Sequence, residues 1–203
     1  MPIKAIVFDI GGVLEITPDL GVDALWEAKL SLPAGEFIER MRAEFRGGSV
    51  GTVSLVEVEA ALERKLGMTK AQVTAYVQDM WREYLGTLNT ELEAYFRTLR
   101  PRFKTAVLSN SFVGAREQEH EAYGFGDLCD VHIYSHEVGM SKPDSRIYHL
   151  TCERLGVLPE ETVFLDDREP AVDGARAIGM HGVVFRDNAQ AIADIEGIVA
   201  AQR

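Results

Sequence analysis

The spacing of hydrophobic residues changes along this chain. The first apolar stretch is short. Residues 3–8 form an apolar, β-branched run that stops at Asp9, and Gly11 and Gly12 follow closely. A run of this length in front of turn-forming residues predicts a buried strand that ends in a tight loop. Loops at strand ends carry the binding sites of many α/β proteins.

From about residue 20 to residue 85 the period changes, and apolar residues recur three and four positions apart. Pro33, the pair Gly47-Gly48 and Gly67 interrupt this pattern. The spacing and its breaks predict four successive helices with no strand between them. The break at residues 46–49 would be flexible, and Arg46 is a candidate to grip an anionic or hydroxylated substrate there.

In the second half of the chain, apolar runs alternate with helical patterns, after one more helix at residues 90–99. The expected strands cover residues 104–108, 131–135, 162–165 and 181–185, and the expected helices 116–123, 145–155 and 171–178. This alternation predicts a parallel sheet with right-handed connections and helices on both faces. Residues 194–203 are expected to fray.

The helical block lies between the first strand and the second, which are about 95 residues apart. We therefore expect an α/β core with a Rossmann-like, doubly wound parallel sheet, formed by residues 1–16 and 88–203. Residues 17–87 would form a helical cap, inserted after the first strand. The cap would cover the edge at which the strands end, where open parallel sheets bind their ligands.

Charge restricts the classes of partner. The 203 residues include 21 Lys and Arg against 32 Asp and Glu, a formal net charge of −11, which disfavours nucleic acid and anionic membranes. No apolar run reaches the roughly 20 residues that span a bilayer. Two cysteines outside any CxxC pair, and no signal peptide before the first strand, predict a cytoplasmic protein. A phosphate ligand would need a local positive charge, most simply a bound cation.

Polar residues follow the predicted strands at the edge where their carboxyl ends meet. They are Asp9 after the first strand, Ser109 and Asn110 after the second, Lys142 beyond the third, and Asp166 and Asp167 after the fourth. Because parallel strands end at one edge, these side chains are expected to share one crevice.

Each of these residue types has a role in phosphoryl transfer. A carboxylate such as Asp9 can attack phosphorus without an activating base, because it is already ionised at neutral pH. A divalent cation, expected to be Mg²⁺, would bridge the nucleophile and the phosphate, with Asp167 and Asp166 as further oxygen ligands. Lys142 and the Ser109 hydroxyl, together with backbone N–H groups, would stabilise the transferring phosphoryl group.

Four segments resemble the motifs of one family. FDIGGV at 8–13, LSNS at 108–111, SKPD at 141–144 and FLDDREPAVDGARAIGM at 164–180 are similar to the four motifs of the haloacid dehalogenase (HAD) superfamily. They occur in the family's order, each at a predicted strand end, with the helical block between the first and the second. The resemblance spans the chain, and it extends to small-cap members that include sugar-phosphate phosphatases.

The resemblance implies roles for individual residues. Asp9 would be both nucleophile and Mg²⁺ ligand, the backbone carbonyl of Gly11 a second ligand, Asp167 a direct ligand and Asp166 a ligand through water. Asn110 and Gly12 are expected to contribute to substrate binding. The predicted activity is hydrolysis of a small phosphomonoester through an aspartyl-phosphate. The expected binding partner is a small phosphorylated metabolite, and the protein is expected to be a monomer or a homodimer.

The first motif departs from the family's DxD pattern, because Gly11 stands where the family has an aspartate that protonates the leaving group. Loss of a general acid typically costs about 10²–10⁴ in rate. The chain either uses substrates with good leaving groups, such as sugar 1-phosphates, or replaces the proton carrier, or binds phosphate or a partner with little turnover. Candidate replacements are Glu15, Glu44 and His136.

A second departure is Ala171, where the family often has an Asp or Asn that orients the metal site; Asp173 lies two residues further on. Dehalogenation of 2-haloacids is a further alternative. It uses the same nucleophile without a metal, and the pair Asp166-Asp167 argues against it.

Overall fold

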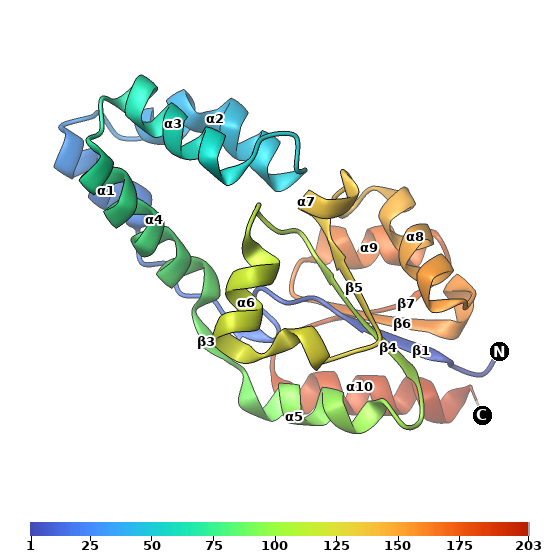
Figure 1. Cartoon of the computed structure of the whole chain (residues 1–203). Helices are drawn as coiled ribbons and strands as arrows, with labels where there is room; N and C mark the ends of the chain where they lie inside the picture. The colour runs from blue at the N-terminus through green and yellow to red at the C-terminus, as the bar shows by residue number, and fades with distance from the viewer. Residues whose placement is uncertain (203) are drawn as a thin grey trace.

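A five-stranded parallel sheet forms the core of the protein in the computed structural model, which describes residues 1–202 (Figure 1). The spatial order of its strands is β5-β4-β1-β6-β7, so the first strand of the chain is the central one. The strands are β1 (Ala5–Phe8), β4 (Lys104–Ser109), β5 (Val131–Tyr134), β6 (Thr162–Asp166) and β7 (His181–Val184). The predicted α/β fold and parallel sheet are confirmed.

Helices cover both faces of the sheet. Alternate residues of β1 point to opposite faces and therefore pack into two different cores. Ile6 and Phe8 belong to one hydrophobic core with α5 (Thr90–Leu99) and α10 (Asn188–Ala201). Ala5 and Val7 belong to a second core with α8 (Ser145–Leu155) and α9 (Glu169–Ala177). All four strand residues are fully buried, as expected for a parallel sheet between two layers of helices.

Smaller elements complete the connections of the core. They are α6 (Ala115–Tyr123), η1 (Phe125–Asp127), α7 (Ser135–Val138) and η2 (Pro159–Glu161). We expected the third strand to include Ser135, but this residue begins α7 instead. Its hydroxyl bonds to backbone carbonyl groups of Ser49 and Ser111, so the chain turns away from the sheet here.

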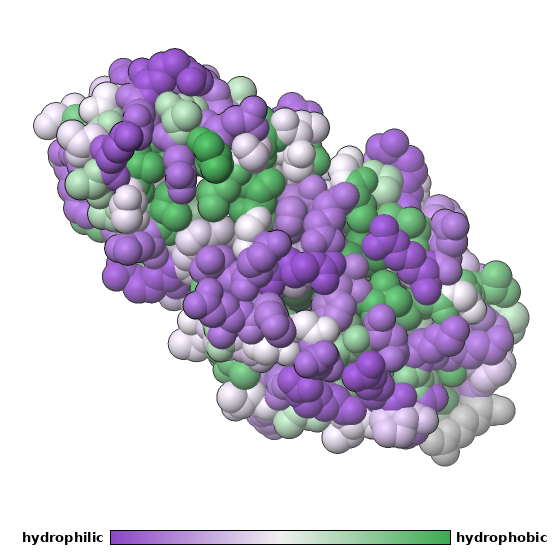
Figure 2. All heavy atoms as spheres, viewed as in Figure 1, coloured by the Kyte–Doolittle hydropathy of each residue, from purple (hydrophilic) through white to green (hydrophobic). Residues whose placement is uncertain are grey.

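Four helices of the cap follow β1, as predicted: α1 (Val22–Leu30), α2 (Glu36–Ser49), α3 (Leu55–Leu66) and α4 (Lys70–Leu85). They have a hydrophobic core of their own and form a lobe that projects from the α/β core (Figure 2). Capping boxes start α3 at Ser54 and α4 at Thr69, which fixes where these helices begin. A two-stranded ribbon, β2 (Glu15–Ile16) with β3 (Thr87–Leu88), joins cap and core.

The predicted helix break at Gly47-Gly48 is wrong. Helix α2 continues to Ser49, and both glycines are buried in its last turn. A Cβ at Gly47 would lie 2.3 Å from the Val53 side chain, and one at Gly48 would lie 2.3 Å from the Phe112 ring. The glycines therefore allow close packing, and the chain leaves the helix only after them.

The expectation that the C-terminal tail frays is also wrong for the described residues. Helix α10 runs to Ala201, and Ala191, Ile195 and Val199 pack into the hydrophobic core. The amino group of Met1 donates a hydrogen bond to Gln202 Oε1 at 3.0 Å. Within residues 1–202 no helix combines the length and the apolar character needed to cross a bilayer.

Candidate active site

Asp9 lies at the centre of the edge where the parallel strands end. It directly follows β1, which pairs with β4 on one side and with β6 on the other. Its backbone N–H donates to the Leu165 carbonyl at 2.8 Å, and its carboxylate accepts the N–H of Ile10 at 2.8 Å. The sheet therefore fixes the position of the carboxylate that we predicted to be the nucleophile.

Lys142 connects two of the predicted carboxylates. Its ammonium lies 2.7 Å from Asp9 Oδ1 and 2.6 Å from Asp166 Oδ2. The side chains of Lys142 and Asp166 are 2% and 0% exposed, so both ion pairs are shielded from water. Asp166 also accepts the N–H of Arg168 at 2.8 Å, which orients its second oxygen.

Asp9, Asp166 and Asp167 form a cluster in which one carboxylate oxygen of each lies within 4.8 Å of the others. Together with the Lys142 ammonium, three ionised carboxylates have a formal charge of −2. This charge and the all-oxygen donor set fit a hard divalent cation such as Mg²⁺. The cluster joins the three side chains that we predicted as ligands, and the Gly11 carbonyl stays a predicted ligand.

The protonation of the cluster depends on this balance of charges. Burial raises the pKa of the Asp9 carboxyl to about 7; Lys142 lowers it and Asp166 raises it. The pKa of Asp167 is also raised, first by desolvation and then by Asp166. A nearby divalent cation would favour the ionised forms of both groups.

The two glycines after Asp9 differ in their surroundings. Gly12 has φ +77°, and a Cβ there would lie 2.5 Å from Asp167 Oδ2. This position therefore requires glycine both for its backbone conformation and for the space that Asp167 occupies. Gly11 is exposed, and among residues 1–202, apart from its chain neighbours, only the Thr17 hydroxyl oxygen would lie within 4 Å of a Cβ there, at 3.9 Å. A side chain would thus fit at Gly11 and not at Gly12.

Asn110 holds the loop that carries Lys142. Its amide donates to the Lys142 carbonyl at 2.9 Å and accepts the Lys142 N–H at 2.8 Å. Ser109 ends β4 beside β1 and is buried. The structure thus gives Asn110 a positioning role that sequence reasoning missed, while its contact with substrate stays a prediction.

Arg46 lies apart from the carboxylate cluster. It lines a groove on the cap together with Arg40, Arg42 and Lys65. Arg40 is paired with Glu36, Arg42 with Glu39 and Lys65 with Glu44. The structure does not bring Arg46 together with the other predicted site residues, so its role in substrate binding stays a prediction.

Two other predicted candidates have local partners. His136 Nδ1 lies 2.7 Å from the Ser111 hydroxyl, and Glu44 pairs with Lys65 inside the cap at 2.6 Å. Asp173 is exposed and pairs with Arg176 at 3.0 Å. It therefore does not replace the metal-orienting residue that is absent at Ala171.

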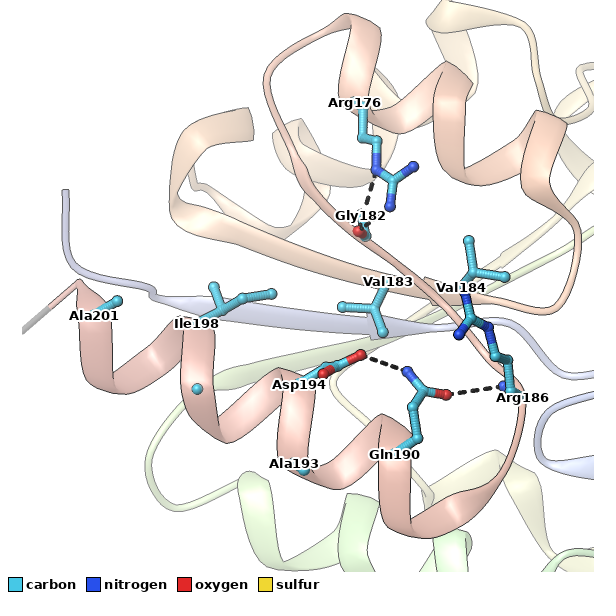
Figure 3. Close-up of a pocket in the computed structure, with 11 residues that line it drawn as sticks. Arg176, Gly182, Val183, Val184, Arg186, Gln190, Ala193, Asp194, Ile198 and Ala201 are labelled. Atoms are coloured by element: carbon cyan, nitrogen blue, oxygen red, sulfur yellow. Dashed lines mark hydrogen bonds between the residues drawn. The ribbon is translucent and has the colours of Figure 1, made fainter.

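A groove at the outer strand β7 is separate from this chemistry. It has a volume of about 490 Å³ and lies between α9 and α10, with Val183 and Val184 of β7 in its lining (Figure 3). Arg176 donates to the Gly182 carbonyl at 2.9 Å, and Gln190 donates to Asp194 at 2.5 Å. None of the three clustered carboxylates lines it.

A second pair of acids, Glu15 and Glu119, lies buried near Asp9. Both are 0% exposed, and both carboxylate oxygens of Glu15 and one of Glu119 have no hydrogen-bond partner within residues 1–202. Burial raises the pKa of Glu15 to about 9, with Glu119 and then Asp9 adding to the effect. The pKa of Glu119 is raised to about 8 by burial, although a hydrogen bond from Tyr134 lowers it. Burial therefore favours the neutral form of both acids.

Sequence patterns gave unequal signals for this pair. Glu15 stands among apolar residues directly after the first motif, and an acid in such a run is a visible anomaly. Glu119 lies in a helix with two other acids, Ala115–Tyr123, so nothing in the sequence distinguishes the buried one.

Comparisons with known proteins agree with this geometry. The family model described as haloacid dehalogenase-like hydrolase matches residues 3–179. Acyl-CoA dehydrogenase family member 10 of Mus musculus is 27% identical over 215 residues, which cover 97% of this chain and 19% of that protein. This chain thus spans about a fifth of that relative's length. A phosphorylated carbohydrates phosphatase of Thermotoga maritima is 26% identical over 192 residues, 91% of this chain and 87% of that protein.

Solved structures share the fold. The HAD family enzyme BT-2542 of Bacteroides thetaiotaomicron, in complex with magnesium and inorganic phosphate, is 21% identical and superimposes with a TM-score of 0.76. The alignment covers 91% of this chain and 94% of that one. The family match extends over most of the chain, from the strand before Asp9 to the helix after Asp167. This chain therefore belongs to the haloacid dehalogenase-like hydrolase family.

Proposed function

We propose that this protein is a Mg²⁺-dependent phosphohydrolase that acts on a small phosphomonoester through an aspartyl-phosphate on Asp9. The observation that carries the proposal is the cluster of Asp9, Asp166 and Asp167 within 4.8 Å, with Lys142 bonded to two of them. Relatives named as phosphatases, and a structural neighbour in complex with magnesium and phosphate, support it.

Each residue has a defined task in the reaction. An Asp9 oxygen attacks phosphorus, the bond from phosphorus to the leaving-group oxygen breaks, and water then releases phosphate and restores the carboxylate. Mg²⁺ held by Asp9, Asp166 and Asp167 would neutralise negative charge on the phosphoryl oxygens. Lys142 stabilises the same charge from the protein side, and the buried ion pairs keep it fixed in place.

Proton supply to the leaving group restricts the substrate. Gly11 provides no acid, so esters with weakly basic leaving groups, such as sugar 1-phosphates, need the least help. Among the candidates for a replacement, only Glu15 has Asp9 among the charges that shift its pKa. The same gap at Gly11 supports a second candidate function, a phosphate- or partner-binding protein with little turnover.

The test is phosphate release from a panel of sugar phosphates, nucleotides and an aryl phosphate, measured with Mg²⁺ and with excess chelator. We expect turnover only with Mg²⁺, and we expect Asp9→Asn to lower it by at least about 10³-fold while the circular dichroism spectrum stays unchanged. Asp173→Asn removes an exposed acid that is paired with Arg176 and is the matched control.

The outcomes separate the alternatives. Binding of inorganic phosphate without hydrolysis of any ester would favour the binding protein. Activity that persists in chelator, or in Asp9→Asn, would remove the metal cluster or the nucleophile from the mechanism. Release of halide from a 2-haloacid in the presence of chelator would favour dehalogenation.

A further inference from the structure

Two cavities share Thr17 as a lining residue, next to the open position at Gly11. Thr17, whose hydroxyl oxygen lies 3.9 Å from where a Gly11 Cβ would be, lines both of them. One has a volume of about 310 Å³ and extends into the cap; the other has a volume of about 410 Å³ and includes Gly12. Because Gly12 packs against Asp167, the cavity that includes Gly12 adjoins the carboxylate cluster, and the cap-side cavity borders it at Thr17. A substrate whose phosphate lies at Asp9 would extend past Thr17.

The cap-side cavity combines hydrogen-bond acceptors with an apolar wall. Its acidic residues are Asp23 and Glu83, and its hydroxyl groups come from Thr17, Tyr76 and Tyr84. The wall consists of Val22, Ile38, Phe45 and Met80. Ile38 is 38% exposed, which leaves apolar surface available for a carbon skeleton. None of the described residues that line this cavity is Lys, Arg or His.

The two carboxylates of this cavity are held in place by the protein. Glu83 accepts the backbone N–H groups of Leu20 and Val22 at 2.8 and 3.2 Å. Asp23 accepts a hydrogen bond from the Tyr76 hydroxyl. A fixed carboxylate at a partly closed site can accept further hydrogen bonds from a ligand but cannot donate any while it is ionised.

The second cavity has the same sign of charge. Asp187 is its acidic residue, Asn89 and Asn188 bond to each other through their amides at 2.8 Å, and Phe185 and Ile16 supply apolar surface. Its described lining also contains no basic side chain. Four basic residues of the cap, Arg40, Arg42, Arg46 and Lys65, line a different groove.

From this arrangement we infer that Thr17, Asp23 and Glu83 form the binding site for the leaving group. The site accepts a leaving group that carries hydroxyl or ammonium hydrogen-bond donors, and it rejects one with a second phosphate or a carboxylate. Donors of the ligand meet oxygen acceptors of the protein, whereas a second anion would meet two carboxylates without a compensating cation. The inference rests on the proposed function for the position of the phosphate.

The test compares three monoesters with and without a second anionic group: a pentitol monophosphate, ethanolamine phosphate and a sugar bisphosphate. We expect kcat/KM to be at least about tenfold higher for the first two than for the bisphosphate, which corresponds to roughly 1.4 kcal/mol. In Glu83→Gln and Asp23→Asn this ratio should fall by about tenfold, because each variant removes one negative charge and keeps the shape of the side chain.

Controls separate recognition from chemistry and folding. An aryl phosphate has no hydroxyl or second anion on its leaving group, so Glu83→Gln, Asp23→Asn and Thr17→Val should change its kcat/KM by a smaller factor than they change that of the pentitol monophosphate. Thr17→Val should lower kcat/KM for the pentitol monophosphate, since it removes one hydroxyl group at constant shape. Glu63→Gln makes the same charge change at an exposed position of the cap and should leave all ratios unaltered.

Binding measurements keep the inference testable if no ester is hydrolysed. The affinity of Asp9→Asn for the pentitol monophosphate and for the bisphosphate can be measured by calorimetry in the presence of Mg²⁺. A preference for the monophosphate that Glu83→Gln weakens would support the leaving-group site even though the proposed function had failed. Equal affinities, equal kcat/KM values, or a ratio that neither acidic variant alters would overturn it.

Discussion

Two groups of acidic residues lie close together in this protein, and they differ in their ion pairs and in their exposure. Asp9, Asp166 and Asp167 gather at the open edge of the sheet, where Lys142 is bonded to two of them. Glu15 and Glu119 lie where the ribbon β2–β3 joins cap and core, fully buried and with unpaired oxygens. The first group has an ammonium partner and an exposed member, Asp167; the second is buried and has no ion pair among residues 1–202.

The difference shows two ways to keep carboxyl groups in a folded protein. At the sheet edge, Lys142 offsets part of the effect of burial, so that the pKa of Asp9 rises only to about 7, and a bound divalent cation would favour the ionised carboxylates. At the cap junction, burial without a cation favours the neutral acids, as the raised pKa values of about 9 and about 8 show. Only the first group therefore has the charge that phosphoryl transfer requires.

Apart from the loss of the nucleophile, the largest expected effect comes from moving one carboxylate out of the cluster of Asp9, Asp166 and Asp167. In Gly12→Ala the new Cβ would lie 2.5 Å from Asp167 Oδ2, and Asp167 would have to turn away. We expect weaker Mg²⁺ binding and a fall in kcat/KM of about 10²-fold, because the cation loses one of its ligands. Calorimetric Mg²⁺ titration and phosphate release measure the two effects.

Gly67→Ala is the matched control, since Gly67 has φ +68° with nothing within 4 Å of its Cβ position. It introduces the same backbone strain, about 1 kcal/mol of stability, without touching the cluster. If Gly12→Ala and Gly67→Ala bound Mg²⁺ equally well, Asp167 would not belong to the metal site.

A smaller effect is expected when a carboxylate is added next to the cluster of Asp9, Asp166 and Asp167. In Gly11→Asp the side chain enters free space, with Thr17 Oγ1 as the one neighbour within 4 Å of the new Cβ. If the missing acid limits the rate, turnover of an alkyl phosphate should rise about tenfold, and that of an aryl phosphate should stay the same. Gly11→Asn has nearly the same shape without the acid and is the control. An equal rise for both esters, or for both variants, would contradict this account.

The sequence allowed the cluster of Asp9, Asp166 and Asp167 to be predicted, but it did not reveal the buried pair Glu15 and Glu119. Asp9, Asp166 and Asp167 each follow a strand, and parallel strands bring their ends to one edge, so pattern alone placed them together. Glu119 depends on how α6 packs against the sheet and Tyr134, a tertiary contact that helix periodicity does not encode.

Local signals also failed where tertiary packing overrode them. Gly47 and Gly48 look like a helix break because glycine is a poor helix former, yet tight packing against Val53 and Phe112 keeps them inside α2. The tail was expected to fray because it is a chain end, but Ile195 and Val199 of α10 are buried in the hydrophobic core. For Gly48 and for α10 the decisive contacts come from segments that are distant in sequence.

The smallest expected effect concerns the buried pair Glu15 and Glu119, and it appears in stability rather than activity. The pKa of Glu119 rises from 4.5 to about 8 on folding, so the folded state keeps a proton that the unfolded chain loses near pH 4.5. The stability that this neutral acid contributes is fully present below pH 4.5 and is lost as the pH rises through 8. The melting temperature of the native protein should therefore fall between pH 6 and pH 8.5.

Glu119→Gln should reduce that fall, because its side chain cannot ionise and its amide oxygen can still accept the Tyr134 hydroxyl. We expect the variant to melt about 3 °C or more above the native protein at pH 8.5, which corresponds to about 1 kcal/mol in a protein of this size. Glu117→Gln on the same helix changes an exposed acid and should follow the native curve. Parallel curves for Glu119→Gln and the native protein would mean that Glu119 is already ionised at pH 6. The two groups of acids would then not differ in charge.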